Sequence, residues 1–213
     1  MTMRWKVLLL LLLSAAPACG PELVGGSERG EVETVVTDDP GSDGPAEQRS
    51  AGPRTGGGAE AAAALVALEG SVSVDAAATI VTAGGVAIPV TGPDATASLA
   101  LGSGDEAPLG RETVEAGSYP LVRVAFRRVE VTLAVPLPLP SGGEGSLSIA
   151  VDLSAGPLLL TVPVTVEVAD DETTTLRVDL NSAAWLSQAD PVTGIVSRGA
   201  FAAAVGVEAV APR

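Results

Sequence analysis

Short segments in which apolar and polar residues alternate recur from about residue 60 to the end of the chain. LVRVAF sends Val122, Val124 and Phe126 to one side, and LLLTVPVTVEV alternates in the same way from Leu158 to Val168. A period of two is the signature of a strand with one buried face. Gly, Pro, Asn and Asp separate these segments at regular spacing. The pattern predicts an antiparallel β-sandwich of Greek-key, immunoglobulin-like type over residues 60–213.

Other segments of the same kind give the remaining strands. ATIVTAGGVAIPV reads as a hairpin turning at Gly84 and Gly85, and ATASLALG, SLSIAVDL and TTTLRVDL read as single strands. LVALEGSVSVDA is a strand with Val72 and Val74 on one face, although its AEAAAAL lead could instead begin a short helix. AFAAAVGVEAV is expected to be the last strand, after a helical turn at NSAAWL capped by Asn181.

Two irregularities are predicted within these strands. The apolar residues of LVRVAF have even numbers and those of the following VEVTL have odd numbers, so the pattern slips at Arg127 and Arg128. Such a slip predicts a β-bulge or a bend. Pro163 lacks a backbone donor and predicts an edge strand or a bulge, and VPLPLPSGGEG is expected to be an exposed connection.

The core has to be built almost without aromatic side chains. Apolar residues make up 46% of the chain and aromatic residues only 2%, which leaves Val, Leu, Ile and Ala to fill it. The net charge of −14 argues against a nucleic-acid partner, because phosphate contacts need Lys and Arg. The same charge argues against passive adsorption to anionic lipid.

The first 18 residues read as a secretion signal. MTMRWK carries Arg4 and Lys6 and no acid, an unbroken apolar run follows from Val7 to Leu13, and small residues lead to Cys19. This is the order of a signal peptide, and the run is shorter than the roughly 20 residues of a membrane span. The alternatives are a buried N-terminal helix or strand, or ordinary secretion that leaves Cys19 as a free thiol.

The box APAC at residues 16–19 resembles a bacterial lipoprotein signal. That resemblance implies cleavage between Ala18 and Cys19, acylation of Cys19 with fatty acids such as palmitate, and stable anchoring through several acyl chains. Ala16 stands where this box usually has Leu. Gly20 follows in place of an Asp, which in a Gram-negative envelope implies the outer membrane.

Residues 19–59 are expected to form a disordered acidic tether. From residue 20 onward Gly, Pro and Ser are abundant, and eight acids face three arginines. Such a segment buries too little apolar surface to offset its ordering entropy, and about 40 residues would span some 30–40 Å. The chain is thus divided into a signal at 1–18, a tether at 19–59 and a sandwich at 60–213.

The mature chain would hold few groups for catalysis. Once residues 1–18 are removed, the chain has no Lys and no His, and Cys19 is its one thiol. Nucleophile–base pairs draw on these residues, as do zinc and copper sites, whereas oxygen ligands suit Ca²⁺. We expect no cofactor, and carboxylate-dependent hydrolysis stays open as enzyme chemistry.

The candidate ligand contacts are Arg123, Arg127 and Trp185. Guanidinium groups bind carboxylates or phosphates, and an exposed indole could stack on a sugar. The structural alternatives are ion pairs of the arginines, Arg128 included, with Glu130 or other surface acids (Glu112 and Glu115), and a Trp185 that packs in the core.

Two further groups of residues have a structural and a functional interpretation. Asp170, Asp171 and Asp179 could hold Ca²⁺ at one end of the sandwich, or they could serve as ordinary turn and cap residues. Tyr119, two residues after Gly117, predicts a tyrosine corner that bonds back to the backbone, with a ligand contact as the alternative.

VEAGSYPLVRVAFRRVEV and TTTLRVDLNSAAWL resemble segments of a family of uncharacterised bacterial and archaeal envelope lipoprotein domains. The resemblance implies a prealbumin-like or carbohydrate-binding-like sandwich in the cell envelope and no established activity. Pro120 and the alanine-rich final segment depart from the family pattern.

We therefore expect a lipid-anchored, non-enzymatic binding or structural domain outside the cytoplasm. Its partners would be the membrane, through the anchor, and an envelope protein or glycan. The alternatives are a carbohydrate- or peptide-binding module, an assembly partner that adds a strand to another envelope protein, and a carboxylate-dependent hydrolase.

Overall fold

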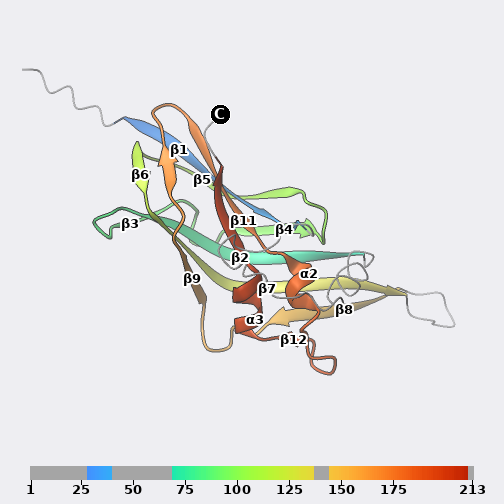
Figure 1. The fold of residues 1–213 in the computed structure, drawn as a ribbon. Helices are drawn as coiled ribbons and strands as arrows, with labels where there is room; N and C mark the ends of the chain where they lie inside the picture. The colour runs from blue at the N-terminus through green and yellow to red at the C-terminus, as the bar shows by residue number, and fades with distance from the viewer. Residues whose placement is uncertain (1–27, 40–68, 137–143, 211–213) are drawn as a thin grey trace, which may run out of the picture.

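The computed structural model describes residues 28–39, 69–136 and 144–210 (Figure 1). Within these ranges the chain is mostly β with two short helices. In chain order the elements are β1 (Arg29–Thr37), β2 (Gly70–Val81), β3 (Ala87–Pro89), β4 (Thr96–Ala100), β5 (Glu106–Glu115), β6 (Gly117–Tyr119), β7 (Leu121–Pro136), β8 (Glu144–Val151), β9 (Leu158–Val162), β10 (Val166–Val168), β11 (Thr173–Asp179), α2 (Ser182–Leu186), β12 (Ile195–Val196), α3 (Arg198–Ala204) and β13 (Gly206–Val210).

Two sheets enclose the core, and a two-stranded ribbon of β6 and β10 adjoins them. The four-stranded sheet has the order β13-β11-β1-β5. The seven-stranded sheet has the order β12-β8-β7-β2-β3, with β4 also on β2 and β9 also on β7. The predicted all-β, sandwich-like fold is confirmed. The sheets are mixed, however, because β1 runs parallel to β11 and β12 runs parallel to β8.

One apolar core lies between the sheets and is built largely from valine. Val36 of β1 and Leu176 of β11 come from one sheet, and Val74 of β2 and Val124 of β7 come from the other; all four are buried. Each such side chain contributes about 1.5–3 kcal/mol when it is fully buried. The alternation of the sequence therefore supplies the core without a large aromatic content.

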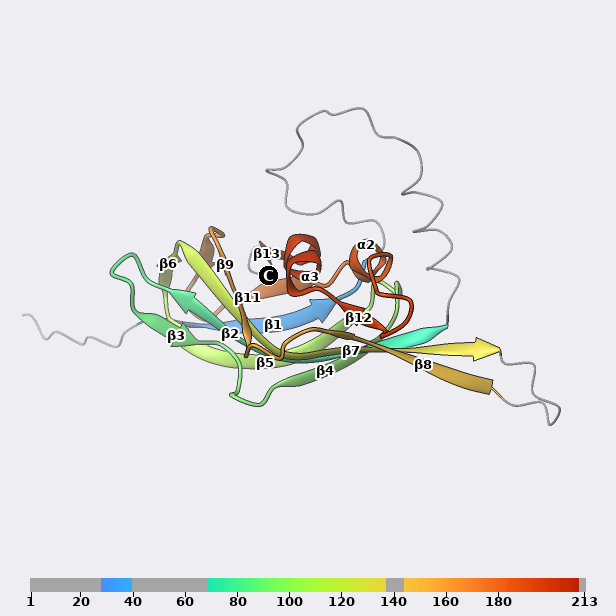
Figure 2. The same cartoon turned by 90° about the horizontal axis from the view of Figure 1, so that it is seen from below.

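Three aromatic rings close one end of this core. Phe201 of α3 lies edge-on to Phe126 of β7, with ring centroids 5.0 Å apart, and edge-on to Trp185 of α2 at 5.4 Å. Edge-to-face contacts of this kind stabilise a fold by more than the burial of their apolar area alone. They attach the two helices, which lie together in Figure 2, to the seven-stranded sheet.

The predicted irregularity at Arg127 and Arg128 is a β-bulge. Along β2 and β7, Asp75 pairs with Arg128, whereas the next residue, Ala76, pairs with Phe126. Arg127 is therefore the extra residue, and β7 continues through it as a single strand from Leu121 to Pro136. The bulge lets the apolar residues on both sides of it face the same core despite their opposite parity.

The predicted hairpin is confirmed, whereas the segment that alternates from Leu158 to Val168 is divided at Pro163. β2 and β3 form the expected hairpin, in which Thr82 N–H donates to the Val86 carbonyl at 2.9 Å and Gly85 has a φ of +83°. Pro163 lies just after β9 and separates it from β10. The two strands then join different neighbours, β7 and β6.

β1 contradicts the predicted disordered tether for residues 29–37, whereas residues 19–27 and 40–59 lie outside the described ranges. It lies in the middle of the four-stranded sheet, parallel to β11 and antiparallel to β5. Its even-numbered residues are buried, while Glu31 and Glu33 reach Arg111 on β5 at 3.5 and 3.0 Å. Glu31 and Glu33 thus lie on the outer face of an amphipathic strand, and the folded domain includes β1.

Only the second half of the last predicted strand is a strand in the structure. AFAAAVGVEAV begins inside α3, and only its GVEAV part forms β13. Alanine has the highest helix propensity of all residues. Ser197 adds a cap, since its side chain accepts a hydrogen bond from Ala200 N–H at 3.2 Å.

The helical turn at NSAAWL is confirmed as α2, but the predicted cap is wrong. Asn181 has a φ of +46°, and its side chain makes no capping hydrogen bond. The carboxylate of Asp38, just after β1, accepts the Ser182 N–H instead, at 2.7 Å. The helix start is therefore satisfied by a residue far away in the sequence.

Some predictions fall outside the described residues. These are the signal at 1–18, acylation at Cys19, the start of the LVALEGSVSVDA strand and most of the VPLPLPSGGEG connection. Within residues 28–39, 69–136 and 144–210, no helix has the length and apolar character needed to cross a membrane.

Candidate functional site

Trp185 is a core residue, which corrects its assignment as a ligand contact. Its side chain is 0% exposed. The indole Nε1 donates to the Leu180 carbonyl at 3.0 Å, and the ring packs edge-on against Phe201. A stacked sugar needs an exposed aromatic face, and Trp185 offers none.

The three aspartates considered as calcium ligands lie at opposite ends of β11. Asp170 and Asp171 precede the strand and Asp179 is its last residue, so about 20 Å of strand separates them. Asp170 Oδ1 accepts the Arg29 N–H at 2.9 Å, which is a turn contact. The proposed site is therefore wrong, and the described ranges hold no metal-binding group of three or more His, Cys, Asp or Glu side chains.

Asp38 is a buried carboxylate that no local pattern in the sequence marks. It is 1% exposed and accepts hydrogen bonds from Ser182 N–H, Ser182 Oγ and Gly102 N–H at 2.7, 2.6 and 2.8 Å. These donors belong to α2 and to the loop after β4. Asp38 therefore joins three segments, and its burial favours a structural role over contact with a substrate.

Asp179 lies beside Asp38 and Asp39. Its Oδ1 accepts the Asp39 N–H at 3.3 Å and the Asn181 N–H at 3.1 Å. Burial, and to a smaller extent the charges of Asp38 and Asp39, raise the pKa of Asp179, and the two backbone donors partly offset this. A raised carboxyl pKa can mark a catalytic acid. Asp179, however, is buried.

A hollow of about 340 Å³ lies over β2, β7 and β8. It is lined by Gly70, Ser71, Thr132, Leu133, Ala134, Gly145 and Ser146. None of these side chains ionises near neutral pH, so the hollow supplies no general acid or base of its own.

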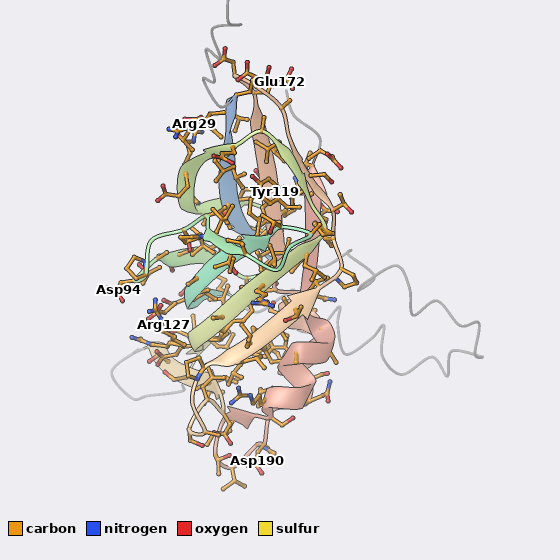
Figure 3. All side chains as sticks on the ribbon, turned by 90° about the vertical axis from the view of Figure 1, so that its left-hand side faces the viewer. Arg29, Asp94, Tyr119, Arg127, Glu172 and Asp190 are labelled. Atoms are coloured by element: carbon orange, nitrogen blue, oxygen red, sulfur yellow. The ribbon has the colours of Figure 1, made fainter. Side chains whose placement is uncertain are left out.

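Arg127 is held by two carboxylates at the bulge of β7. Its Nε and Nη2 lie 3.0 and 2.7 Å from Asp75 Oδ1, and its Nη1 lies 3.3 Å from Asp94 Oδ1. Figure 3 labels Arg127 and Asp94, which lie on the same side of the molecule. Arg128 pairs with Glu130 at 2.5 Å, as one structural alternative predicted. Arg127 thus presents no free guanidinium to a ligand.

Arg123 lies on the outer face of the seven-stranded sheet in a different environment. Strand pairing gives two rows across β2, β7 and β9, which we call the Arg123 face: Thr79, Arg123 and Thr161, then Ala77, Ala125 and Leu159. The face has no acid. Arg123 is half-buried, and among the described residues its side chain makes no hydrogen bond or ion pair. It is the one proposed ligand contact that keeps a free donor group.

β9, at the border of the Arg123 face, is an uncharged edge strand. It pairs with β7 and with no other described strand, and no charged residue occurs from Leu153 to Val166. Leu159 is 59% exposed. The edge strand β5, by contrast, carries four charged residues, and β3 and β12 have only three and two residues. Charge and shortness usually protect sheet edges from pairing, and β9 lacks charge.

Tyr119 forms the predicted corner. The ring is buried, and its hydroxyl donates to the Glu115 carbonyl at 2.6 Å. Gly117, with a φ of +155°, makes the turn between β5 and the tyrosine. Burial raises the pKa of Tyr119, and the charge of Glu115 raises it further by a smaller amount.

Comparison with protein-family models, curated proteins and solved structures gives no match to the chain. The candidate site is therefore defined by its own geometry, as the Arg123 face and the β9 edge. The sequence held a signal for the edge, because LLLTV is uncharged and flanked by Pro157 and Pro163. No local signal marked the contact between Asp38 and Ser182, which are distant in the sequence.

Proposed function

We propose that the chain is a lipid-anchored lipoprotein of the cell envelope whose β-sandwich binds a partner or serves a structural role. The anchor rests on one observation: a charged start, the apolar run Val7 to Leu13 and the APAC box ending in Cys19 follow one another. Gly20 supports the outer membrane in a Gram-negative cell. The resemblance to uncharacterised envelope lipoprotein domains supports the same compartment.

The chemistry of the domain favours binding over catalysis. The buried carboxylates of Asp38 and Asp179 accept backbone hydrogen bonds, and the hollow over β7 has no ionisable lining. A carboxylate-dependent hydrolase needs two acids that face each other across an open cleft. With Trp185 buried, a glycan-binding module would have to rely on Arg123 and hydroxyl groups, which makes it the weaker binding alternative.

Metabolic labelling tests the anchor. The full chain, expressed with an alkyne fatty acid, should incorporate the label and sediment with membranes. Cys19→Ser should lose the label and be released, whereas Ser187→Ala, an exposed change far from the signal, should behave as the parent. An unlabelled, soluble protein whose Cys19 reacts with maleimide would instead establish ordinary secretion with a free thiol.

A second candidate function is strand addition to another envelope protein, which the uncharged β9 edge favours. An added strand would gain main-chain hydrogen bonds along β9 and apolar contact at Leu159. A photo-crosslinking residue at position 159 should capture a defined partner, whereas the same residue at Val192, which is 90% exposed, should not. Equal capture at both positions would exclude specific pairing at β9.

A further inference from the structure

We propose that the lipid anchor holds the sandwich close to the bilayer and turns one defined end of it toward the lipid. The inference rests on the proposed acylation of Cys19. The end concerned, which we call the β1 pole, is formed by exposed residues of five segments: Glu28, Arg29, Glu115, Ser118, Glu167, Asp170, Asp171 and Glu172.

The chain between the anchor and the domain is short. Nine residue steps lead from Cys19 to Glu28, and at about 3.3–3.6 Å per residue they span at most about 30 Å. The tether predicted from composition had about 40 residues, and the linker has fewer because β1 belongs to the sandwich.

The point at which this linker leaves the domain is fixed. Ala116 N–H donates to the Glu28 carbonyl at 2.8 Å, and Asp171 N–H donates to the Arg29 carbonyl at 2.9 Å. Arg29 N–H in turn donates to Asp170 Oδ1 at 2.9 Å. Because β1 pairs with a strand on each side, its start cannot separate from the sheet without breaking both pairings. The linker therefore always pulls on the β1 pole.

The β1 pole should face the lipid without adhering to it. It carries one cation, Arg29, and six acids: Glu28, Glu115, Glu167, Asp170, Asp171 and Glu172. Anionic lipid headgroups repel such a surface over roughly a Debye length, about 10 Å at 0.1 M salt. The short linker and this repulsion together favour an orientation in which the β1 pole faces the bilayer and the long axis of the domain points away from it.

The opposite end of the domain is then directed away from the bilayer. Glu172 and Asp190 lie at opposite ends of the molecule in Figure 3. Val192, in the turn after Asp190, is 90% exposed. β9 lies between the two ends (Figure 1), so its free edge would face sideways, where a neighbouring envelope protein could reach it.

Energy transfer to the membrane tests the orientation. The lipidated full chain would be reconstituted into vesicles that contain a headgroup-labelled acceptor lipid, with a donor dye on Ser118→Cys, Leu159→Cys or Val192→Cys. An acylated Cys19 has no free thiol, and the chain has no other cysteine, so each donor position is unique. Transfer should be strongest from position 118, intermediate from 159 and weakest from 192.

Controls separate this inference from the anchor itself. Vesicle flotation and intact mass are measured first, and a chain that is not acylated and does not float would refute the anchor. A floating chain with equal transfer from positions 118 and 192 would refute the orientation alone.

Two further changes test the linker and the charge. A Gly/Ser insertion after Gly26 that doubles the length of the linker should reduce the differences in transfer between positions 118, 159 and 192. Adding anionic lipid to the vesicles should lower the energy transfer from position 118, and adding salt should restore it. Energy transfer from position 118 that increases with anionic lipid would refute the repulsion.

Discussion

The carboxylate of Asp38 accepts two hydrogen bonds from Ser182, one from the backbone N–H at 2.7 Å and one from the hydroxyl at 2.6 Å. A third donor, Gly102 N–H, lies 2.8 Å away. One buried side chain thus joins the end of β1, the start of α2 and the loop after β4. Hydrogen bonds to a charged acceptor are about twice as strong as neutral ones.

Asp38→Ala should therefore destabilise the domain by about 3 kcal/mol. The substitution leaves two buried donors of Ser182 and the partly buried Gly102 N–H without an acceptor, and each buried group costs about 1–3 kcal/mol unless water replaces the partner. Urea unfolding of the chain without residues 1–18 would measure the loss. Asp105→Ala, at an exposed position, is the control and should change the free energy of unfolding by less than about 0.5 kcal/mol. Equal effects of the two changes would contradict the role of Asp38.

Local patterns in the sequence predicted many of the strands and three of their details, although they missed β1, β5 and β12. The bulge at Arg127 followed from a change of apolar parity, and the corner at Tyr119 from a tyrosine soon after a glycine. Both depend on contacts between residues close in sequence or on one strand. The hairpin at Gly85 followed in the same way from its turn residues.

Features that depend on distant contacts could not be predicted. β1 lies within a stretch that is rich in Gly, Pro and acids, so composition indicated a tether. Its three buried valines find their place only through the partner strands β5 and β11. The cap of α2 comes from Asp38, which is distant in the sequence. Arg123, Arg127 and Trp185 were equivalent candidates in the sequence. Ion pairing of Arg127 and burial of Trp185, both set by tertiary structure, distinguish them from Arg123.

Asp179→Asn should make the domain more stable at neutral pH. Burial raises the carboxyl pKa in the folded state, so the wild-type domain loses stability as the pH rises from the unfolded pKa, about 3.9, through the folded value. Asn keeps an oxygen that can accept the backbone N–H groups of Asp39 and Asn181, and it removes the charge. The advantage of the variant should be present at pH 7 and disappear below about pH 4. Unfolding curves across this range would show it, and a destabilised variant at pH 7 would contradict the prediction.

Tyr119→Phe should cost about 1 kcal/mol, the usual net contribution of one hydrogen bond. The change removes the hydroxyl that donates to the Glu115 carbonyl and keeps the buried ring. Glu115→Gln keeps the backbone carbonyl that accepts this hydrogen bond and serves as the matched control. It should change the free energy of unfolding by less than about 0.5 kcal/mol. Because the folded pKa of Tyr119 is raised, the wild type should also lose stability above about pH 10, and the Phe variant should lose less. A Phe variant as stable as wild type would show that the corner hydrogen bond contributes nothing.

The final prediction concerns the boundary of the domain. A chain that begins at residue 60, where the apolar alternation suggested that the sandwich starts, should not fold, whereas a chain that begins at residue 28 should. Without β1, strands β5 and β11 lose their shared neighbour, and the core loses the side chains of Val32, Val35 and Val36. Three buried valines alone are worth about 5–9 kcal/mol, comparable with the whole stability of a typical domain.

Circular dichroism and Trp185 fluorescence would distinguish the two chains, because a buried indole emits at shorter wavelength than an exposed one. A synthetic peptide of residues 28–39 added to the shorter chain provides the matched control. It should restore the folded signal by taking the place of β1, and the same peptide with Val36→Asp should not, because that change puts an unpaired charge into the core. A shorter chain that folds by itself would show that β1 is dispensable and that the linker to Cys19 is as long as its composition suggested.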